Sequence, residues 1–114
     1  MRQLLELPAE QRPTAIFAAN NFLGIGVIEA LRAANLVVPN DMAVVCFDDI
    51  ELASALDPFL TVVTQPARSF GTIAAQFLLE RLEGESGMQP RKVVLTSELI
   101  VRRSCGARLE HTRP

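Results

Sequence analysis

The chain has 114 residues, of which 49% are hydrophobic, and a formal net charge of −2 at pH 7. This size and composition are typical of a compact globular domain, and the scattered basic residues exclude a nucleic-acid-binding surface within the chain. No apolar run is long enough to span a bilayer, and the first residues do not form a secretory signal, so we expect no membrane partner. Cys46 and Cys105 follow no disulfide or metal-binding pattern, which is consistent with a reducing, cytoplasmic location.

Three apolar segments predict parallel strands. They are residues 14–19, 43–47 and 60–64. Continuous apolar runs of this length are typical of strands buried on both faces of a parallel sheet. Two further strands are expected at residues 91–95 and 98–102, with Arg102 and Arg103 at a solvated strand end. Because such sheets usually have about five or six strands, the fold class is α/β with a partial doubly wound parallel sheet, and we expect a fragment of a longer protein.

Helices are predicted around these strands. Residues 1–7 read as the end of a helix, residues 20–35 form the next, and Glu51–Leu56 is a short helical turn. Pro66 opens a longer helix that runs to about Glu83, because the first turn tolerates a missing amide. Apolar positions at helical spacing predict the apolar faces of the two long helices: Phe22, Ile25, Ile28, Leu31 and Ala34 in the first, and Phe70, Ile73, Ala74, Phe77, Leu78 and Leu82 in the second.

Polar side chains follow each of the three strands at its carboxyl end. Asn20 and Asn21 follow the first strand, Asp48 and Asp49 the second, and Gln65 the third. Ligands of open α/β sheets bind outside the carboxyl ends of the strands, so these residues predict a small-molecule site. Simpler explanations stay open, because an Asn, Asp48 or Asp49 can cap the following helix and Gln65 can be a solvated junction residue.

The pair Asp48 and Asp49 also raises the alternative of a small α/β enzyme that uses Mg²⁺. The matching basic and hydroxyl groups are missing, since the only lysine, Lys92, is distant in the sequence. His111 stands alone, and the glycines of residues 24–26 do not form a dinucleotide fingerprint but indicate close helix packing. We therefore predict no enzyme activity, no catalytic residues, no metal site and no cofactor.

Six segments occur in a specific order along the chain. They are residues 13–21 (PTAIFAANN), Gly26 with Ala30-Leu31-Arg32, residues 38–41 (VPND), residues 44–50 (VVCFDDI), residues 60–66 (LTVVTQP) and residues 98–105 (ELIVRRSC). In this order and spacing the chain resembles the C-terminal part of LacI/GalR-family transcriptional regulators. The resemblance runs from about Pro13 to Gly106.

The resemblance implies a bacterial repressor whose effector domain has two lobes, like periplasmic sugar-binding proteins, with the ligand between them. Residues 1–64 would belong to the C-terminal lobe, residues 65–95 would form a crossover helix and strand of the N-terminal lobe, and residues 96–114 would be a returning strand and tail. Operator DNA would be bound only through a helix-turn-helix that this chain does not contain.

The resemblance also implies site residues. The effector, by default a sugar or sugar phosphate, would contact the positions matching Asn20 or Asn21, Asp48 and Gln65. The family usually has Asn-Asp where this chain has Asn20 and Asn21, and Gly where it has Cys46, so one carboxylate contact would become an amide contact.

The family dimerises through the helix after the first strand and the segment after the Asp pair. Residues that match this surface are Phe22, Ile25, Glu29, Ala55 and Leu56. A homodimer or other homo-oligomer is therefore expected, with the alternative that Phe22 and Ile25 are simply core residues. A fragment of a periplasmic sugar-binding protein is the other alternative, although the VVCFDDI and RRSC segments favour a regulator.

Overall fold

A computed structural model describes residues 1–83 and 89–107 of the chain; the predicted C-terminal tail, with His111, lies outside these residues. The helical elements are α1 (Arg2–Leu5), the 3-10 turn η1 (Ala9–Gln11), α2 (Asn21–Ala33), α3 (Glu51–Leu56) and α4 (Ala67–Leu82). The strands are β1 (Ala15–Ala18), β2 (Ala43–Phe47), β3 (Thr61–Thr64) and β4 (Glu98–Ile100). The chain divides into two compact units, one of Met1–Thr64 with Leu99–Pro114 and one of Gln65–Glu98. Each is described by itself.

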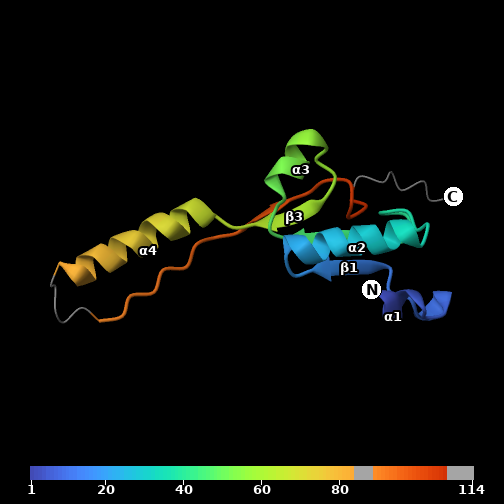
Figure 1. The fold of residues 1–114 in the computed structure, drawn as a ribbon, viewed down its shortest axis with the longest axis horizontal. Helices are drawn as coiled ribbons and strands as arrows, with labels where there is room; N and C mark the ends of the chain where they lie inside the picture. The colour runs from blue at the N-terminus through green and yellow to red at the C-terminus, as the bar shows by residue number, and fades with distance from the viewer. Residues whose placement is uncertain (84–88, 108–114) are drawn as a thin grey trace. The chain divides into compact units, whose positions relative to one another are not determined.

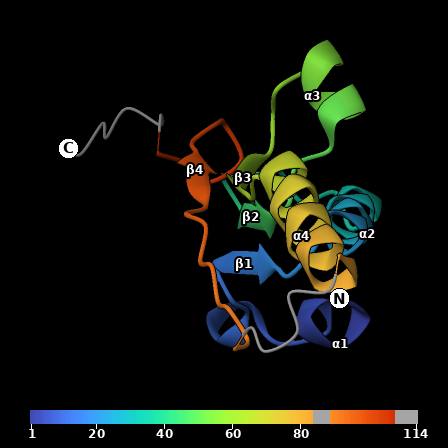
Figure 2. The same ribbon diagram turned by 90° about the vertical axis from the view of Figure 1, so that its left-hand side faces the viewer.

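The sheet has the strand order β1-β2-β3-β4, and its first three strands run parallel. Figure 1 labels β1 and β3, and Figure 2 labels all four strands. The register places Ala18 beside Cys46, and Cys46 beside Val62. The predicted set of three parallel strands and the α/β class are therefore confirmed. Each parallel pair needs a crossover, and α2 and α3 are the helices of the two crossovers.

Helix α2 packs on the sheet through Gly24, Val27 and Leu31, which are its buried residues (Figure 2). Val27 and Leu31 form the larger core with Met42 and Val44, at the start of β2. The predicted apolar face was therefore wrong in part. The structure exposes 80% of Phe22 and 42% of Ile25, because these residues lie off the stripe that faces β1 and β2.

Only one face of the sheet is well covered in the first unit. Ala18, Cys46 and Val62, in register on neighbouring strands, form a second small core. On the opposite side, Phe17 is 61% exposed and its partner Val45 is half-buried. The expectation of burial on both faces is therefore wrong for β1, because no helix of the first unit, among its described residues, covers that side.

The segment after β4 fastens the sheet. The Ser104 hydroxyl, fully buried, donates to the Val44 carbonyl oxygen at 2.6 Å and accepts from the Thr61 amide at 2.7 Å. The Ser104 amide also donates to the carbonyl oxygen of Phe59. A single side chain thus joins β2 to β3 next to their first residue pair, Val45 and Thr61.

The second unit consists of α4 and the extended segment that follows it. Helix α4 has no buried residue, and Leu78 and Leu82 are 58% and 72% exposed, so the predicted buried stripe is not buried here. Residues 91–95 were predicted to form a strand but form none. Among the described residues of the second unit there is no neighbouring strand for this segment to pair with, and a strand without a hydrogen-bonded neighbour is not stable in water. Arg91 instead stacks on Phe77, 3.9 Å from the ring centroid.

No helix among the described residues is both long and apolar enough to cross a membrane.

Candidate functional site

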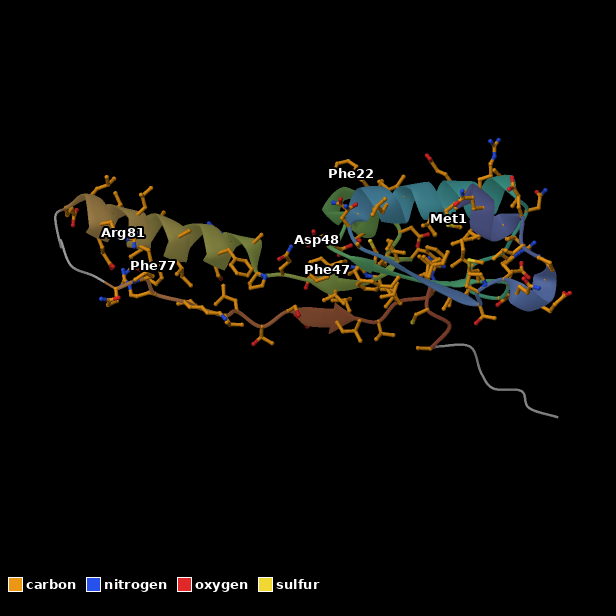
Figure 3. All side chains as sticks on the ribbon, turned by 90° about the horizontal axis from the view of Figure 1, so that it is seen from below. Met1, Phe22, Phe47, Asp48, Phe77 and Arg81 are labelled. Carbon is orange, nitrogen blue, oxygen red and sulfur yellow. The ribbon has the colours of Figure 1, made fainter. Side chains whose placement is uncertain are left out.

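The predicted ligand residues of the first unit lie at the carboxyl edge of the sheet. Ala18 is beside Cys46 in the register, and Asn20 and Asp48 each lie two residues beyond this pair. Asp48 lies directly after Phe47, at the end of β2 (Figure 3). Gln65 follows β3 and is the first residue of the second unit. The structure thus places Asn20, Asn21 and Asp48 on one unit and Gln65 on the other.

Asn20 is the N-cap of α2, as the sequence predicted for one of the two asparagines. Its Oδ1 accepts from the Leu23 amide at 2.9 Å, which satisfies one of the otherwise unpaired amides of the first turn. The Asn20 carbonyl oxygen accepts from the thiol of buried Cys46, 3.1 Å away. Asn21 begins the helix proper and is half-buried. The junction between β1 and α2 is therefore held from both the helix and the neighbouring strand.

Asp48 has a left-handed backbone conformation, with φ of 67°. A side chain other than glycine is strained there, by about 1 kcal/mol or more, and such residues persist only where the surrounding structure fixes them. The Asp48 amide donates to the Val63 carbonyl oxygen at 2.9 Å, which holds its N-terminal side to β3. Its C-terminal side is fixed through the next residue, Asp49.

Asp49 forms a bidentate ion pair with Arg102. Arg102 Nη1 donates to Asp49 Oδ1 at 2.9 Å and Nη2 donates to Oδ2 at 2.5 Å, with 13% and 16% of the two side chains exposed. Asp49 Oδ1 also accepts from the Ser54 hydroxyl and from the Ile50 amide at the start of α3. Hydrogen bonds from Arg102 lower the pKa of Asp49 to about 2. The same bonds raise the pKa of Arg102.

This ion pair corrects the expectation that Arg102 is a solvated strand end. Sequence reasoning missed the pair because 53 positions separate its members. The signal in the sequence was that Asp48, and not its neighbour Asp49, was assigned to the ligand, which left Asp49 available for another partner. Because both oxygens of Asp49 are engaged by Arg102, Asp48 and Asp49 are not arranged as a two-carboxylate magnesium site, and the described residues contain no cluster of metal-ligating side chains.

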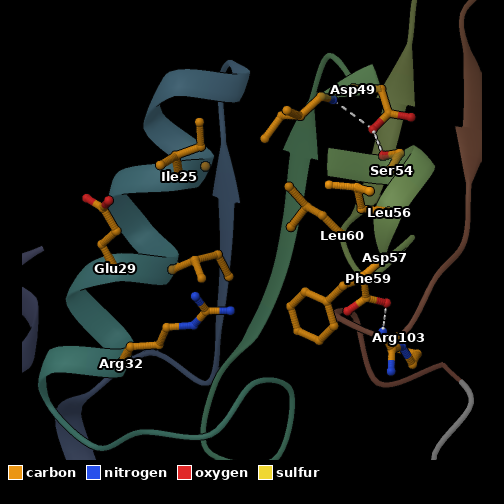
Figure 4. Close-up of a pocket in the computed structure, with 13 residues that line it drawn as sticks. Ile25, Glu29, Arg32, Asp49, Ser54, Leu56, Asp57, Phe59, Leu60 and Arg103 are labelled. Carbon is orange, nitrogen blue, oxygen red and sulfur yellow. Dashed lines mark hydrogen bonds and ion pairs between the residues drawn. The ribbon is translucent and has the colours of Figure 1, made fainter. Parts of the chain in front are cut away.

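A groove of about 510 Å³ lies between α2 on one side and α3 with the start of β3 on the other (Figure 4). Ile25, Glu29 and Leu56, three of the predicted dimer-interface residues, line it. The remaining two, Phe22 and Ala55, are exposed and are not among its lining residues. The groove also carries both signs of charge, from Glu29 and Asp57 and from Arg32 and Arg103. The predicted ligand residues do not line it.

Comparisons with known proteins identify the family. Residues 1–105 match the periplasmic binding protein-like domain. The chain is 39% identical over 93 residues to the probable opine utilization operon repressor of Rhizobium rhizogenes, covering 82% of this chain and 47% of that protein. It is 42% identical over 104 residues to the ribose operon repressor of Escherichia coli K12, covering 91% of this chain and 31% of that protein.

A solved structure agrees in fold. The sucrose-bound LacI family transcriptional regulator of Lactobacillus casei superimposes with a TM-score of 0.72 and 36% sequence identity, over 90% of this chain and 37% of that chain. The chain thus spans less than half the length of each of these relatives. All three are transcriptional regulators by name, and the alternatives of a periplasmic sugar-binding protein and a magnesium enzyme are not favoured. The chain belongs to the LacI/GalR family of transcriptional regulators, and corresponds to part of their periplasmic-binding-protein-like effector domain.

Proposed function

We propose that this chain is part of the effector-binding and dimerisation domain of a cytoplasmic LacI/GalR-type repressor. The effector is a small polar molecule, by default a sugar or sugar phosphate, and it controls DNA binding by a helix-turn-helix outside the chain. The observation that carries the proposal is the register of β1 and β2, which puts Asn20 and Asp48 at one edge of the sheet. The relatives named for ribose and bound to sucrose support a sugar.

The chemistry of the edge suits a polyhydroxylated ligand. The Asp48 carboxylate accepts hydrogen bonds from hydroxyl groups, and the amides of Asn20, Asn21 and Gln65 can both donate and accept. Oδ1 of Asn20 is engaged as the helix cap, so the contribution of this residue to a ligand is its amide nitrogen. We assign Gln65 the role of a contact from the segment that leads out of β3.

We further propose that the protein dimerises through α2 and α3. Phe22 and Leu56 are 80% and 83% exposed in the single chain, and exposed apolar side chains that gather in one patch mark protein–protein contacts. Ile25 and Glu29 continue this surface into the groove, and Ala55 adds to it from α3. Effector binding would then shift the population between two arrangements of the dimer, which differ in the spacing of the DNA-reading domains.

The proposal is tested in a chimaeric repressor, with this chain replacing the matching 104 residues of the Escherichia coli ribose operon repressor. Repression of a reporter is measured against a panel of pentoses, hexoses and disaccharides. We expect one class of sugar to relieve repression. Asp48→Ala, Gln65→Ala and Asn20→Ser should then lose this response but keep repression, because serine retains the helix cap while removing the amide.

Asn40→Ala, at an exposed loop position, is the matched control and should respond like the parent. A chimaera in which Asp48→Ala responds normally to the same sugar would contradict the assignment of the site. A chimaera that represses but ignores every sugar in the panel would contradict the class of effector.

A further inference from the structure

Arg102 joins its own segment to three others in the first unit. Besides Asp49 after β2, its Nη1 donates to the Ser54 hydroxyl of α3 at 2.7 Å and to the Leu60 carbonyl oxygen at 3.0 Å. Its own amide donates to the Thr61 hydroxyl at 2.9 Å. The guanidinium group is therefore tied to the end of β2, to α3 and to the beginning of β3. An exposed surface ion pair has no such fixed geometry.

The first consequence concerns Asp48. Its left-handed backbone conformation is held between the hydrogen bond to Val63 on one side and the fixed Asp49 on the other. If Arg102 no longer fixed Asp49, the strain at Asp48 could relax by rotation of the following peptide. The direction of the Asp48 carboxylate, which is the proposed contact of the ligand, would then change.

The second consequence concerns α3. Ser54 accepts from Arg102 and donates to Asp49 Oδ1 at 2.6 Å, and the Ser54 amide donates to the Ile50 carbonyl oxygen at 2.8 Å. Because Leu56 follows two residues later on this short helix, the same hydrogen-bond cluster fixes both the turn at Asp48 and one wall of the groove.

We propose that Arg102 is a positioning residue, which holds the Asp48 turn in the conformation that binds effector and fixes α3 relative to it. The ligand part of this inference rests on the proposed function. The low pKa of Asp49 is consistent with it, since the carboxylate remains charged throughout the physiological range.

The test compares amide hydrogen exchange, followed by NMR, in the 114-residue chain and in Arg102→Lys, which keeps the charge but loses the planar fork. Exchange of the Asp48, Ile50 and Ser54 amides should accelerate about tenfold or more, while amides of β1 and β2 and of the Val27 core keep their rates. Ser54→Ala, a milder variant, should give the same local pattern with a smaller acceleration.

Arg12→Lys is the matched control. Arg12 is also half-buried in the first unit and donates to backbone carbonyl oxygens, of Leu5 at 2.9 Å and Leu7 at 3.3 Å, but it is not part of the cluster around Asp49. Its replacement should leave the exchange of the Asp48 amide unchanged. Uniform acceleration of all amides in Arg102→Lys, or no acceleration, would overturn the positioning role.

A second measurement separates this inference from the proposed function. Inducer titrations are carried out in the chimaeric repressor, because the isolated chain contains only part of the two-lobed site. We expect Arg102→Lys to need about tenfold more of the sugar that relieves repression in the parent chimaera, and Arg12→Lys to match the parent. If the parent chimaera ignores every sugar, the proposed function is contradicted, and the exchange pattern decides the role of Arg102 alone.

Discussion

Replacing Gly24 with alanine should not stabilise the chain, although alanine is the better helix former. Gly24 is buried on α2 and faces β2. A Cβ atom there would lie 2.8 Å from Cys46 Sγ, 3.5 Å from Cys46 Cβ and 3.6 Å from Leu60 Cδ2. The first distance is too short for a carbon–sulfur contact, so the helix or the strand would have to move. Gly26, two residues later, is exposed and has no atom within 4 Å of such a Cβ.

The sign of the difference in unfolding free energy between the two alanine variants follows from two effects. Alanine in a helix interior is favoured over glycine by about 1 kcal/mol, which both substitutions gain. Gly24→Ala also incurs the cost of overpacking a filled core, about 1–3 kcal/mol. Gly26→Ala should therefore stabilise the chain by about 1 kcal/mol, and Gly24→Ala should be less stable than Gly26→Ala by about 1–3 kcal/mol.

Urea unfolding of both variants and the parent, at equal protein concentration and followed by circular dichroism, measures this difference. The cause is tested by making Gly24→Ala in a Cys46→Ala background, which lacks the sulfur atom. There the double variant should be about as stable as Cys46→Ala alone, because the added Cβ atom no longer meets Cys46 Sγ. Equal stabilisation by the two glycine substitutions would refute the packing of α2 on Cys46.

Three further outcomes are expected. The pKa of Asp49 is lowered from 3.8 to about 2, so its charged form stabilises the fold above pH 4 by about 2 kcal/mol. This contribution is lost as the pH falls from 4 to 2. The difference in unfolding free energy between the parent and Asp49→Asn, measured by urea unfolding, should therefore shrink over the same pH range. Ser104→Ala should cost about 1–3 kcal/mol by leaving a buried amide unpaired, whereas Thr72→Ala, at an exposed hydroxyl, should change stability by less than about 0.5 kcal/mol in thermal unfolding. Leu56→Ser should shift the oligomer toward monomer in light scattering, and an unchanged mass at all concentrations would count against α3 as an interface.

The sequence was sufficient to predict the three parallel strands and the edge that carries the candidate site. Buried parallel strands need apolar residues on both sides of the backbone, so their runs are continuous, and polar residues mark where each run ends. That rule locates Asn20 and Asp48 from the sequence alone. It also explains the helix cap, because the chain must leave the strand and satisfy the first amides of α2 at the same point.

Helical periodicity could not decide which side of α2 faces the sheet. The helix has apolar residues on more than one side: Phe22 and Ile25 are three residues apart and Val27 and Leu31 four, and both spacings are helical. Which stripe is buried depends on how closely the backbone approaches β2, and that approach is set by Gly24 against Cys46. A local pattern contains no information on this contact.

Long-range pairs were equally inaccessible. Nothing in the residues next to Arg102 indicates that its partner is Asp49, because the pair forms only after β3 and the segment beyond β4 have been brought together. The same reasoning explains the missing strand at residues 91–95. An apolar run has strand propensity wherever it occurs, but the strand forms only if another strand is available to receive its hydrogen bonds.

The fold separates stability from recognition along a single strand. The larger core, built from Val27, Leu31, Met42 and Val44, lies at the start of β2, whereas Asp48 lies at its end. In a parallel sheet all carboxyl ends are at the same edge, so the residues proposed to contact the ligand can vary without touching that core. Ligand binding by Asp48 nevertheless requires the backbone geometry of its own turn, which depends on Asp49 and Arg102. Substitutions at Asp48 should therefore alter which ligand is bound, and substitutions at Arg102 should alter how well any ligand is bound.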